Sequence, residues 1–188
     1  MNTSNKKLDA ELKLHNLKID VWDEYNLNKT VPWVNDILAE LIKTQKDNVD
    51  TTYQQGEEEN ISLSLNFLRK NTPSFKDHLM TDGRIVATYN AACIKCLAPT
   101  PIQIDMEFKS LHLNSSLRDL PEYAEIDEIF TENAQRELYF YSKGTLPLRE
   151  MLQEYLFMGI VPFPIHDENC LGLCAVCGIN LNHETCKH

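Results

Sequence analysis

The sequence lacks the features that would direct a chain into a membrane or an export pathway. No apolar run approaches the ~18 residues that a membrane-spanning helix needs. Residues 1–11 are polar and contain acids, with neither the apolar core of a signal peptide nor the pattern of a transit peptide. We therefore expect a cytoplasmic protein, whose thiols stay reduced and whose cysteines serve metal or redox chemistry rather than disulfides.

The motifs of common hydrolases and nucleotide-binding enzymes are also missing. The sequence contains no H-E-x-x-H, no zinc-deaminase signature, no G-x-S-x-G and no phosphate-binding glycine loop. Because it has only 6 glycines, it offers little material for cofactor-binding loops. His183-Glu184 only faintly resembles the combination of a catalytic zinc ligand and a nearby general base. We predict that the protein is not an enzyme, and we keep a zinc- or thiol-dependent enzyme as an alternative.

Basic residues are scarce, since 18 lysines and arginines face 28 acids and the formal net charge is -10. Acids gather in two segments without any base, 47–59 and 119–135, which we interpret as solvated loops. An acidic surface does not supply the positive field that drives binding to nucleic-acid phosphates. This disfavours direct, tight RNA binding by the surface as a whole and favours a basic protein partner.

The cysteines, in contrast, are concentrated in two places. One is the knuckle Cys93-Ile94-Lys95-Cys96, and the other is the segment 166–188. Cys-x2-Cys presents two thiolates to one tetrahedral zinc ion, and Gly178 after the second knuckle permits the turn that this needs. Two histidines, His166 and His188, raise the number of potential ligands from six to eight, which is enough for two tetrahedral ions. The eight predicted zinc ligands are Cys93, Cys96, His166, Cys170, Cys174, Cys177, Cys186 and His188.

The eight ligands can pair in more than one way. We favour one site from the first knuckle with His166 and Cys170, and a second site within 174–188, because the second loop then closes locally at small entropic cost. Alternatively, the two knuckles meet in one ribbon-like site and the other four ligands form another. A third possibility is a single ion with spare ligands, in which His183 could replace His188.

Apolar periodicity predicts an α+β fold, mainly antiparallel β-sheet with two helices and a C-terminal zinc-knuckle tail. An Asp82-Gly83 turn is expected between two strands, and the first knuckle is expected at the tip of a long hairpin. We expect a body at 1–165 and a cysteine-rich tail at 166–188 that packs on it. The expected strands are 12–19, 61–67, 85–91, 102–108 and 137–142, and the expected helices are 30–44 and 145–156.

Three stretches carry a resemblance to a known family. They are the strand and knuckle at 89–97 (YNAACIKCL), the run at 157–164 (FMGIVPFP) and the cysteine tail at 170–182 (CLGLCAVCGINLN). Over most of residues 10–188 the chain resembles the YceD family, the large ribosomal RNA subunit accumulation proteins, although its N-terminal half is similar only in pattern. The family commonly has cysteine at the positions of His166 and His188, and histidine is equally able to bind zinc.

The resemblance implies a ribosome-biogenesis factor that supports accumulation or processing of large-subunit ribosomal RNA. We expect a zinc-stabilised adaptor whose partner is a basic large-subunit ribosomal protein or a pre-ribosomal particle, with ribosomal RNA contacted only indirectly. The alternative is an RNA-binding zinc module that contacts ribosomal RNA directly through Arg84, Lys95, Lys109 and Lys187. Salt dependence separates the two, because a binder of several phosphates loses affinity steeply as salt rises.

Overall fold

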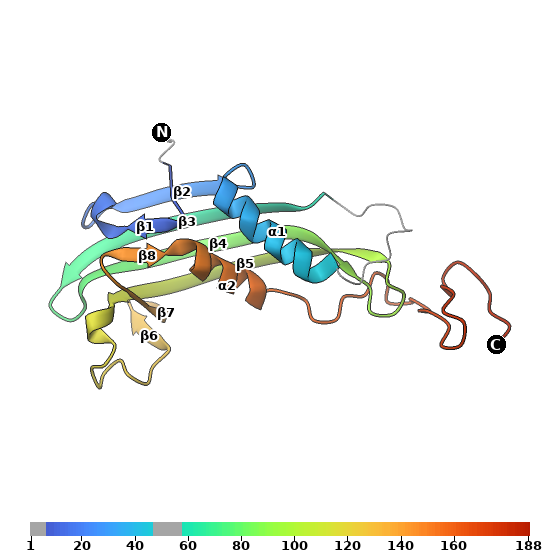
Figure 1. Ribbon diagram of the computed structural model, residues 1–188. Coiled ribbons are helices and arrows are strands. Elements are labelled where there is room, and N and C mark those ends of the chain that lie inside the picture. Colours follow the sequence, from blue (N-terminus) through green and yellow to red (C-terminus); the bar gives the residue numbers. More distant parts are fainter. Residues whose placement is uncertain (1–6, 47–57) are drawn as a thin grey trace.

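The computed structural model describes residues 7–46 and 58–188 as one large sheet, one small sheet and two helices (Figure 1). Within these residues the large sheet has the strand order β2-β3-β4-β5-β7-β6, and the small sheet pairs β1 with β8. The strands are β1 (Glu11–Lys13), β2 (Trp22–Asn28), β3 (Asn60–Thr72), β4 (Lys76–Ala92), β5 (Pro99–Asn114), β6 (Glu128–Thr131), β7 (Ala134–Tyr141) and β8 (Thr145–Pro147). The helices are α1 (Pro32–Lys46) and α2 (Leu148–Met158).

The centre of the large sheet is a pair of long hairpins. β3 pairs antiparallel with β4 from Thr72↔Lys76 onward, and β4 pairs antiparallel with β5 up to Ala92↔Pro99. The first cysteine knuckle joins these last two residues, so it lies at the tip of a long hairpin, as predicted. β7 is the exception to the antiparallel pattern, because it runs parallel to the second half of β5.

Both helices cover one face of the large sheet (Figure 1). Each turns an apolar stripe toward the strands, which places the main core between helices and sheet. A smaller core lies around Leu111 and Leu113 and includes Tyr123 from the acidic segment. The buried residues of the helix stripes are Val34, Ile37, Leu38 and Leu41 in α1 and Leu148, Met151, Leu152, Tyr155 and Leu156 in α2.

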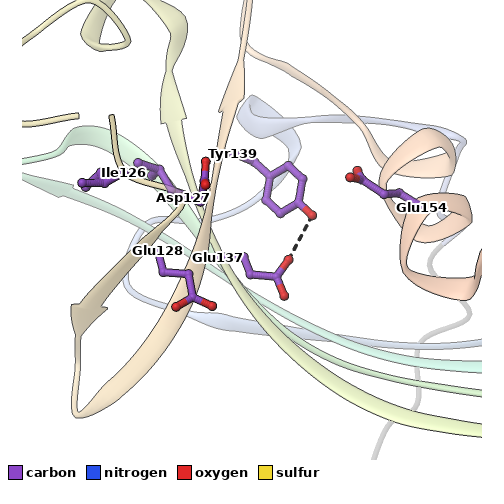
Figure 2. Close-up of a pocket in the computed structure, with 7 residues that line it drawn as sticks. Ile126, Asp127, Glu128, Glu137, Tyr139 and Glu154 are labelled. Atoms are coloured by element: carbon purple, nitrogen blue, oxygen red, sulfur yellow. Dashed lines mark hydrogen bonds between the residues drawn. The ribbon is translucent and has the colours of Figure 1, made fainter. Parts of the chain in front are cut away.

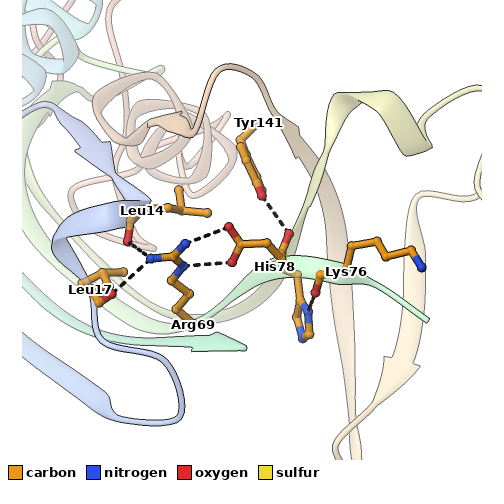
Figure 3. A network of polar contacts seen from close by, with 7 residues as sticks. Leu14, Leu17, Arg69, Lys76, His78 and Tyr141 are labelled. Carbon is orange, nitrogen blue, oxygen red and sulfur yellow. Dashed lines mark hydrogen bonds and ion pairs between the residues drawn. The ribbon is translucent and has the colours of Figure 1, made fainter. Parts of the chain in front are cut away.

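A polar network fastens the N-terminal segment to the β3–β4 hairpin (Figure 3). The Arg69 guanidinium donates two hydrogen bonds of 2.9 Å to the Asp77 carboxylate and a third, of 3.0 Å, to the Leu14 carbonyl. Tyr141 donates its hydroxyl to the Asp77 carbonyl at 2.7 Å. A planar guanidinium supplies this fork of donors, which a lysine would not.

The predicted class, α+β with mainly antiparallel sheet, two helices and a C-terminal Cys/His cluster, is confirmed. The helix from Pro32 and the strands after Asn60 also form as expected. The loop predicted for 46–60 falls largely on residues 47–57, which lie outside the described residues. None of the helices in the described part of the chain is long and apolar enough to cross a membrane.

The predicted Asp82-Gly83 turn was wrong. Both residues lie inside β4, opposite Asn66 and Leu65 of β3, and the chain reverses at 73–75. A Cβ on residue 83 would overlap the ring of Phe108, so this glycine makes room for an aromatic ring on the next strand.

Several other element boundaries differ from those predicted. The strand expected at 12–19 ends at Lys13, and a short 3-10 turn follows it. Leu12 is buried from the strand and Leu14 from the 3-10 turn, so the alternating leucines do not belong to one continuous strand. β2 and β6 were not predicted, since each buries few apolar side chains. The residues expected to open the second helix form β8 instead, and α2 begins at Leu148, after Pro147.

Candidate metal centre

The first knuckle is held by two backbone hydrogen bonds. The Leu97 N–H donates to the Cys93 carbonyl at 2.8 Å, and the Cys93 N–H donates to the Ala98 carbonyl at 2.9 Å. Leu97 takes a positive φ of 61°, which lets the chain turn back into β5. Both thiols of the knuckle therefore point to the same side, and both cysteines are buried.

The tail brings His166 and Cys170 to this knuckle to form the first cluster (Cys93, Cys96, His166 and Cys170). His166 Nδ1 lies 3.3 Å from Cys96 Sγ and 3.4 Å from Cys93 Sγ. The sulfurs of Cys93 and Cys170 are 4.0 Å apart. All four ligand atoms lie within 4.8 Å of one another.

Backbone hydrogen bonds hold the tail against the knuckle. The Ile94 N–H donates to the Pro164 carbonyl and the Leu173 N–H donates to the Lys95 carbonyl, both at 2.9 Å. Gly172 crosses so close to Lys95 that a Cβ would lie 3.1 Å from the Lys95 carbonyl oxygen. Its φ of +78° also favours glycine, so this position needs glycine for two independent reasons.

The second knuckle repeats the geometry of the first. The Gly178 N–H donates to the Cys174 carbonyl at 2.9 Å, and the Cys174 N–H donates to the Ile179 carbonyl at 2.8 Å. Gly178 has the positive φ, 75°, at the position that corresponds to Leu97. A bridge between Leu173 and Asn180 closes the turn, as the pair Ala92↔Pro99 closes the first.

The second cluster (Cys174, Cys177, Cys186 and His188) lies wholly within the last residues of the tail. Cys186 Sγ lies 3.3 Å from Cys174 Sγ, 3.5 Å from Cys177 Sγ and 2.8 Å from His188 Nδ1. Again the four ligand atoms lie within 4.8 Å of one another. The members are exposed or half-buried, so this cluster is more open to solvent than the first.

The two clusters fit a tetrahedral ion in size and chemistry. Zinc–sulfur bonds of about 2.3 Å place two ligand sulfurs about 3.8 Å apart, and a sulfur and an imidazole nitrogen about 3.6 Å apart. The sulfur–sulfur separations, 3.3, 3.5 and 4.0 Å, lie on both sides of the first value, and the sulfur–nitrogen separations, 2.8 to 3.4 Å, lie below the second. Each cluster therefore offers three thiols and one imidazole, a Cys3His group that could hold a metal ion.

The thiols differ in their readiness to ionise. Burial raises the pKa of Cys93, but hydrogen bonds from His166 and from backbone N–H groups outweigh it, so the net pKa is lowered. Burial raises the pKa of Cys96, which also lies beside Cys93. In the second cluster, backbone N–H groups lower the pKa of Cys174 to about 6. Because neighbouring thiolates repel, a bound cation is what allows all three in a cluster to be charged together.

Asn182 is a supporting residue that the sequence interpretation missed. Its amide nitrogen donates to Cys170 Sγ at 3.4 Å, and its carbonyl oxygen accepts the Leu171 N–H at 2.8 Å. It thus connects the loop of the second cluster to a ligand of the first. The repeated asparagines of the N-L-N run at 180–182 were a signal that could have marked it.

The structure brings together all eight predicted ligands, in the grouping of the favoured pairing rather than the interleaved one. His183 belongs to neither group. Among the other histidines, His78 and His112 are buried in the body and His15 is exposed.

The proposed RNA-contacting cations are partly engaged within the chain. Arg84 donates two hydrogen bonds, of 2.8 and 2.7 Å, to the Asp105 carboxylate. Lys95 donates to the Cys170 carbonyl at 3.3 Å. Because of these contacts, fewer of the four cations are free to bind RNA phosphates than the sequence alone suggests.

The fold and site define an α+β protein that carries two Cys3His clusters, one tying the tail to a hairpin tip and one within the tail. A family model described as large ribosomal RNA subunit accumulation protein YceD matches residues 81–188, which is more than half of the chain. The chain belongs to the YceD family. The match begins within β4 and includes both clusters, and the family's name describes no enzyme. Comparison with curated proteins gave no match, and neither did comparison with solved structures.

Proposed function

We propose that the protein is a ribosome-biogenesis factor that supports accumulation or processing of large-subunit ribosomal RNA as a zinc-stabilised, protein-binding adaptor. The observation that carries this proposal is the family match, because it spans both Cys3His clusters. The partner would be a basic large-subunit ribosomal protein or a pre-ribosomal particle, met in the cytoplasm. The net charge of -10 supports attraction to such a partner.

Zinc is the proposed ion, one in each cluster. Three thiolates and one imidazole form a closed set of four ligands, which is typical of structural zinc rather than of catalytic zinc with an open position. Bound there, the ion of the first cluster would crosslink the tail at 166–188 to the body at 1–165, and the ion of the second cluster would crosslink the tail to itself. We therefore propose a binding role without an enzymatic step.

Direct RNA binding is the competing proposal. Two of its four candidate cations, Arg84 and Lys95, already donate to groups of the chain itself. Lys109 lines a hollow together with three glutamates, Glu107, Glu128 and Glu137, which would repel phosphate. The adaptor proposal is therefore the better supported of the two.

The test is a strain that lacks the protein, complemented with variants. We expect large-subunit RNA to fall relative to small-subunit RNA, and the wild-type chain to restore it. Cys177→Ser should restore it less well than Val176→Ser, a matched control, because Val176 is an exposed neighbour outside both clusters. A normal ratio of the two RNAs in the absence of the protein would refute the proposed function.

Binding in vitro separates adaptor from RNA binder. The purified protein should bind large-subunit RNA weakly at physiological salt and should bind at least one basic ribosomal protein readily. Tight RNA binding with a steep salt dependence, and no protein partner, would favour the RNA-binding module instead.

A further inference from the structure

The sulfur atoms of the second cluster are more accessible to solvent than those of the first. Cys177 is exposed, and Cys174 and Cys186 are half-buried. In the first cluster, each of the three cysteines is at most 6% exposed. The hollow between α2 and the hairpin of β6 and β7 is open too, but carboxylates and Tyr139 line it and no cysteine does (Figure 2). Because exposure governs how readily a thiolate is oxidised, a small oxidant meets the thiols of the second cluster first.

The geometry of the second cluster also favours a bond between two of its sulfurs. Cys186 Sγ lies 3.5 Å from Cys177 Sγ. Because a disulfide joins two sulfurs at about 2 Å, a shift of roughly 1.5 Å connects this pair. Residues 185–188 belong to neither a helix nor a strand, so no element has to break for Cys186 to move.

The first cluster is protected from the same reaction by its surroundings. The sulfurs of Cys93 and Cys170 are 4.0 Å apart, and Ala98 and Leu173 pack against this cluster. The hydrogen bond from the Leu173 N–H to the Lys95 carbonyl holds the tail in place there. An oxidant therefore has little access, and the sulfurs have little freedom to approach one another.

Within the second cluster, Cys177 is the sulfur that an oxidant reaches first. It is exposed, and its neighbour Val176 is 73% exposed. Cys174 is half-buried, and its sulfur accepts the Val176 N–H at 3.4 Å. Cys186 is half-buried beside Cys177, in the position of the second thiol that attacks an oxidised first one.

We propose that the second cluster is a peroxide-sensitive site, in which hydrogen peroxide joins Cys177 to Cys186 and the cluster gives up its zinc ion. The Cys177 thiolate attacks one peroxide oxygen, so that an S–O bond forms, the O–O bond breaks and hydroxide leaves. The Cys186 thiolate then attacks the sulfur of this sulfenic acid, which forms the disulfide and expels a second hydroxide. The two thiolates lose two electrons in total, and the peroxide gains them.

The consequence is confined to the end of the chain. After the disulfide forms, only Cys174 and His188 remain of the four ligands, which is too few for a closed zinc site. The first cluster shares none of these ligands, so Cys170 still attaches the tail to the hairpin tip. Oxidation therefore frees the segment from residue 174 onward and leaves the body folded. This proposal rests on the proposed function, since it adds regulation to the zinc site which that function uses.

The test treats the zinc-loaded full chain with hydrogen peroxide and follows released zinc with a metallochromic dye. We expect one zinc ion to leave at least about tenfold faster than the other, because oxidation follows exposure. Peptic peptides of the alkylated protein should show Cys177 joined to Cys186, since cleavage after Leu181 separates these two cysteines. Release of both ions at one rate, release of neither, or a disulfide that forms first in the first cluster would overturn the proposal.

Two variants test the roles of the individual thiols. In Cys186→Ser the sulfenic acid has no nearby thiol of Cys186 to attack it, so dimedone, which traps sulfenic acids, should label Cys177. Val176→Ser is the matched control and should form the disulfide at the wild-type rate, because Val176 is exposed and lies outside both clusters. A dimedone label on Cys174 in place of Cys177 would contradict the assignment.

Hydrogen exchange measures where the oxidised chain opens. Exchange should increase in 174–188 and stay unchanged in β4 and β5, and dithiothreitol with added zinc should reverse the increase. Faster exchange in β4 and β5 would contradict a change confined to the chain end. The peroxide test involves no RNA, so its failure is distinct from a normal RNA ratio in cells that lack the protein, which would refute the function.

Discussion

At the scale of single residues, Gly83 shows how one missing side chain shapes the body. The Phe108 ring occupies the space where a Cβ would lie, and it stacks on Tyr155 of α2. We expect Gly83→Ala to lower the free energy of unfolding by about 1–3 kcal/mol, the usual cost of overpacking a core, as measured by urea denaturation. In a Phe108→Leu background the same change should cost less. An equal cost in both backgrounds would contradict the steric explanation.

His112 makes a prediction about pH. Its Nε2 lies 2.9 Å from the Ser110 hydroxyl and 3.1 Å from the Thr81 hydroxyl, in a fully buried place. Burial, and then the charge of Arg136, lower its pKa from 6.5 to about 3. Between these values the unfolded chain binds a proton that the folded chain refuses, so stability falls as the pH drops from 6.5.

The size of this effect follows from linkage. One such site makes the free energy of unfolding fall by up to about 1.4 kcal/mol per pH unit. His78, whose pKa is also lowered by burial, acts in the same direction. Denaturation of the wild type and of His112→Gln between pH 7 and pH 5 should show a shallower slope in the variant. Identical slopes would mean that His112 does not remain neutral in the fold.

Ligand residues were easier to predict than the residues that support them. Cysteine spacing reports chemistry directly, because Cys-x2-Cys at a turn has few other uses in a reducing compartment. The roles of Asn182 and Gly172 depend on how segments distant in the chain cross one another. Gly83 is a similar case, since a glycine after aspartate is typical of a turn until its neighbouring strand is known.

At the scale of elements, the two knuckles have the same backbone turn but different attachments. The first lies at the tip of β4 and β5 and meets ligands from the tail, whereas the second meets ligands within the tail alone. Cys96→Ser should therefore destabilise the body, because it frees the hairpin tip from the tail. Cys177→Ser should loosen the tail and leave the sheet folded.

Hydrogen exchange of β4 and β5 amides, together with denaturation, measures this difference. Metal ligation contributes on the order of 10 kcal/mol in small domains, so the loss in Cys96→Ser should be large. Val176→Ser, an exposed substitution outside both clusters, should behave as the wild type. Equal loss of global stability in the two cysteine variants would contradict the separate roles.

Elements with strong apolar periodicity were predicted well, as in α1 and β3. β2 and β6 escaped prediction because they are edge strands that bury few apolar side chains. β8 was mistaken for the start of a helix, since a proline near a helix start is equally compatible with a short strand before it. The parallel pairing of β7 with β5 depends on the route of the acidic segment between them, which periodicity does not describe.

At the scale of the whole molecule, the two clusters and the family match that includes them support the proposed function. The C-terminal tail lies beyond one end of the large sheet (Figure 1). The first cluster joins the tail to the body, and the second lies within the tail. The proposed function depends on both clusters being metal centres, because the family match includes both and the first attaches the tail to the body.

Metal analysis of the purified, reduced protein tests that dependence most directly. Because each of the two clusters has four ligands, we expect two zinc ions per chain, falling to one in Cys177→Ser. A single ion in the wild type would remove His166 or His188 from the ligands. Absence of bound metal in a folded protein whose six thiols are intact would contradict the account.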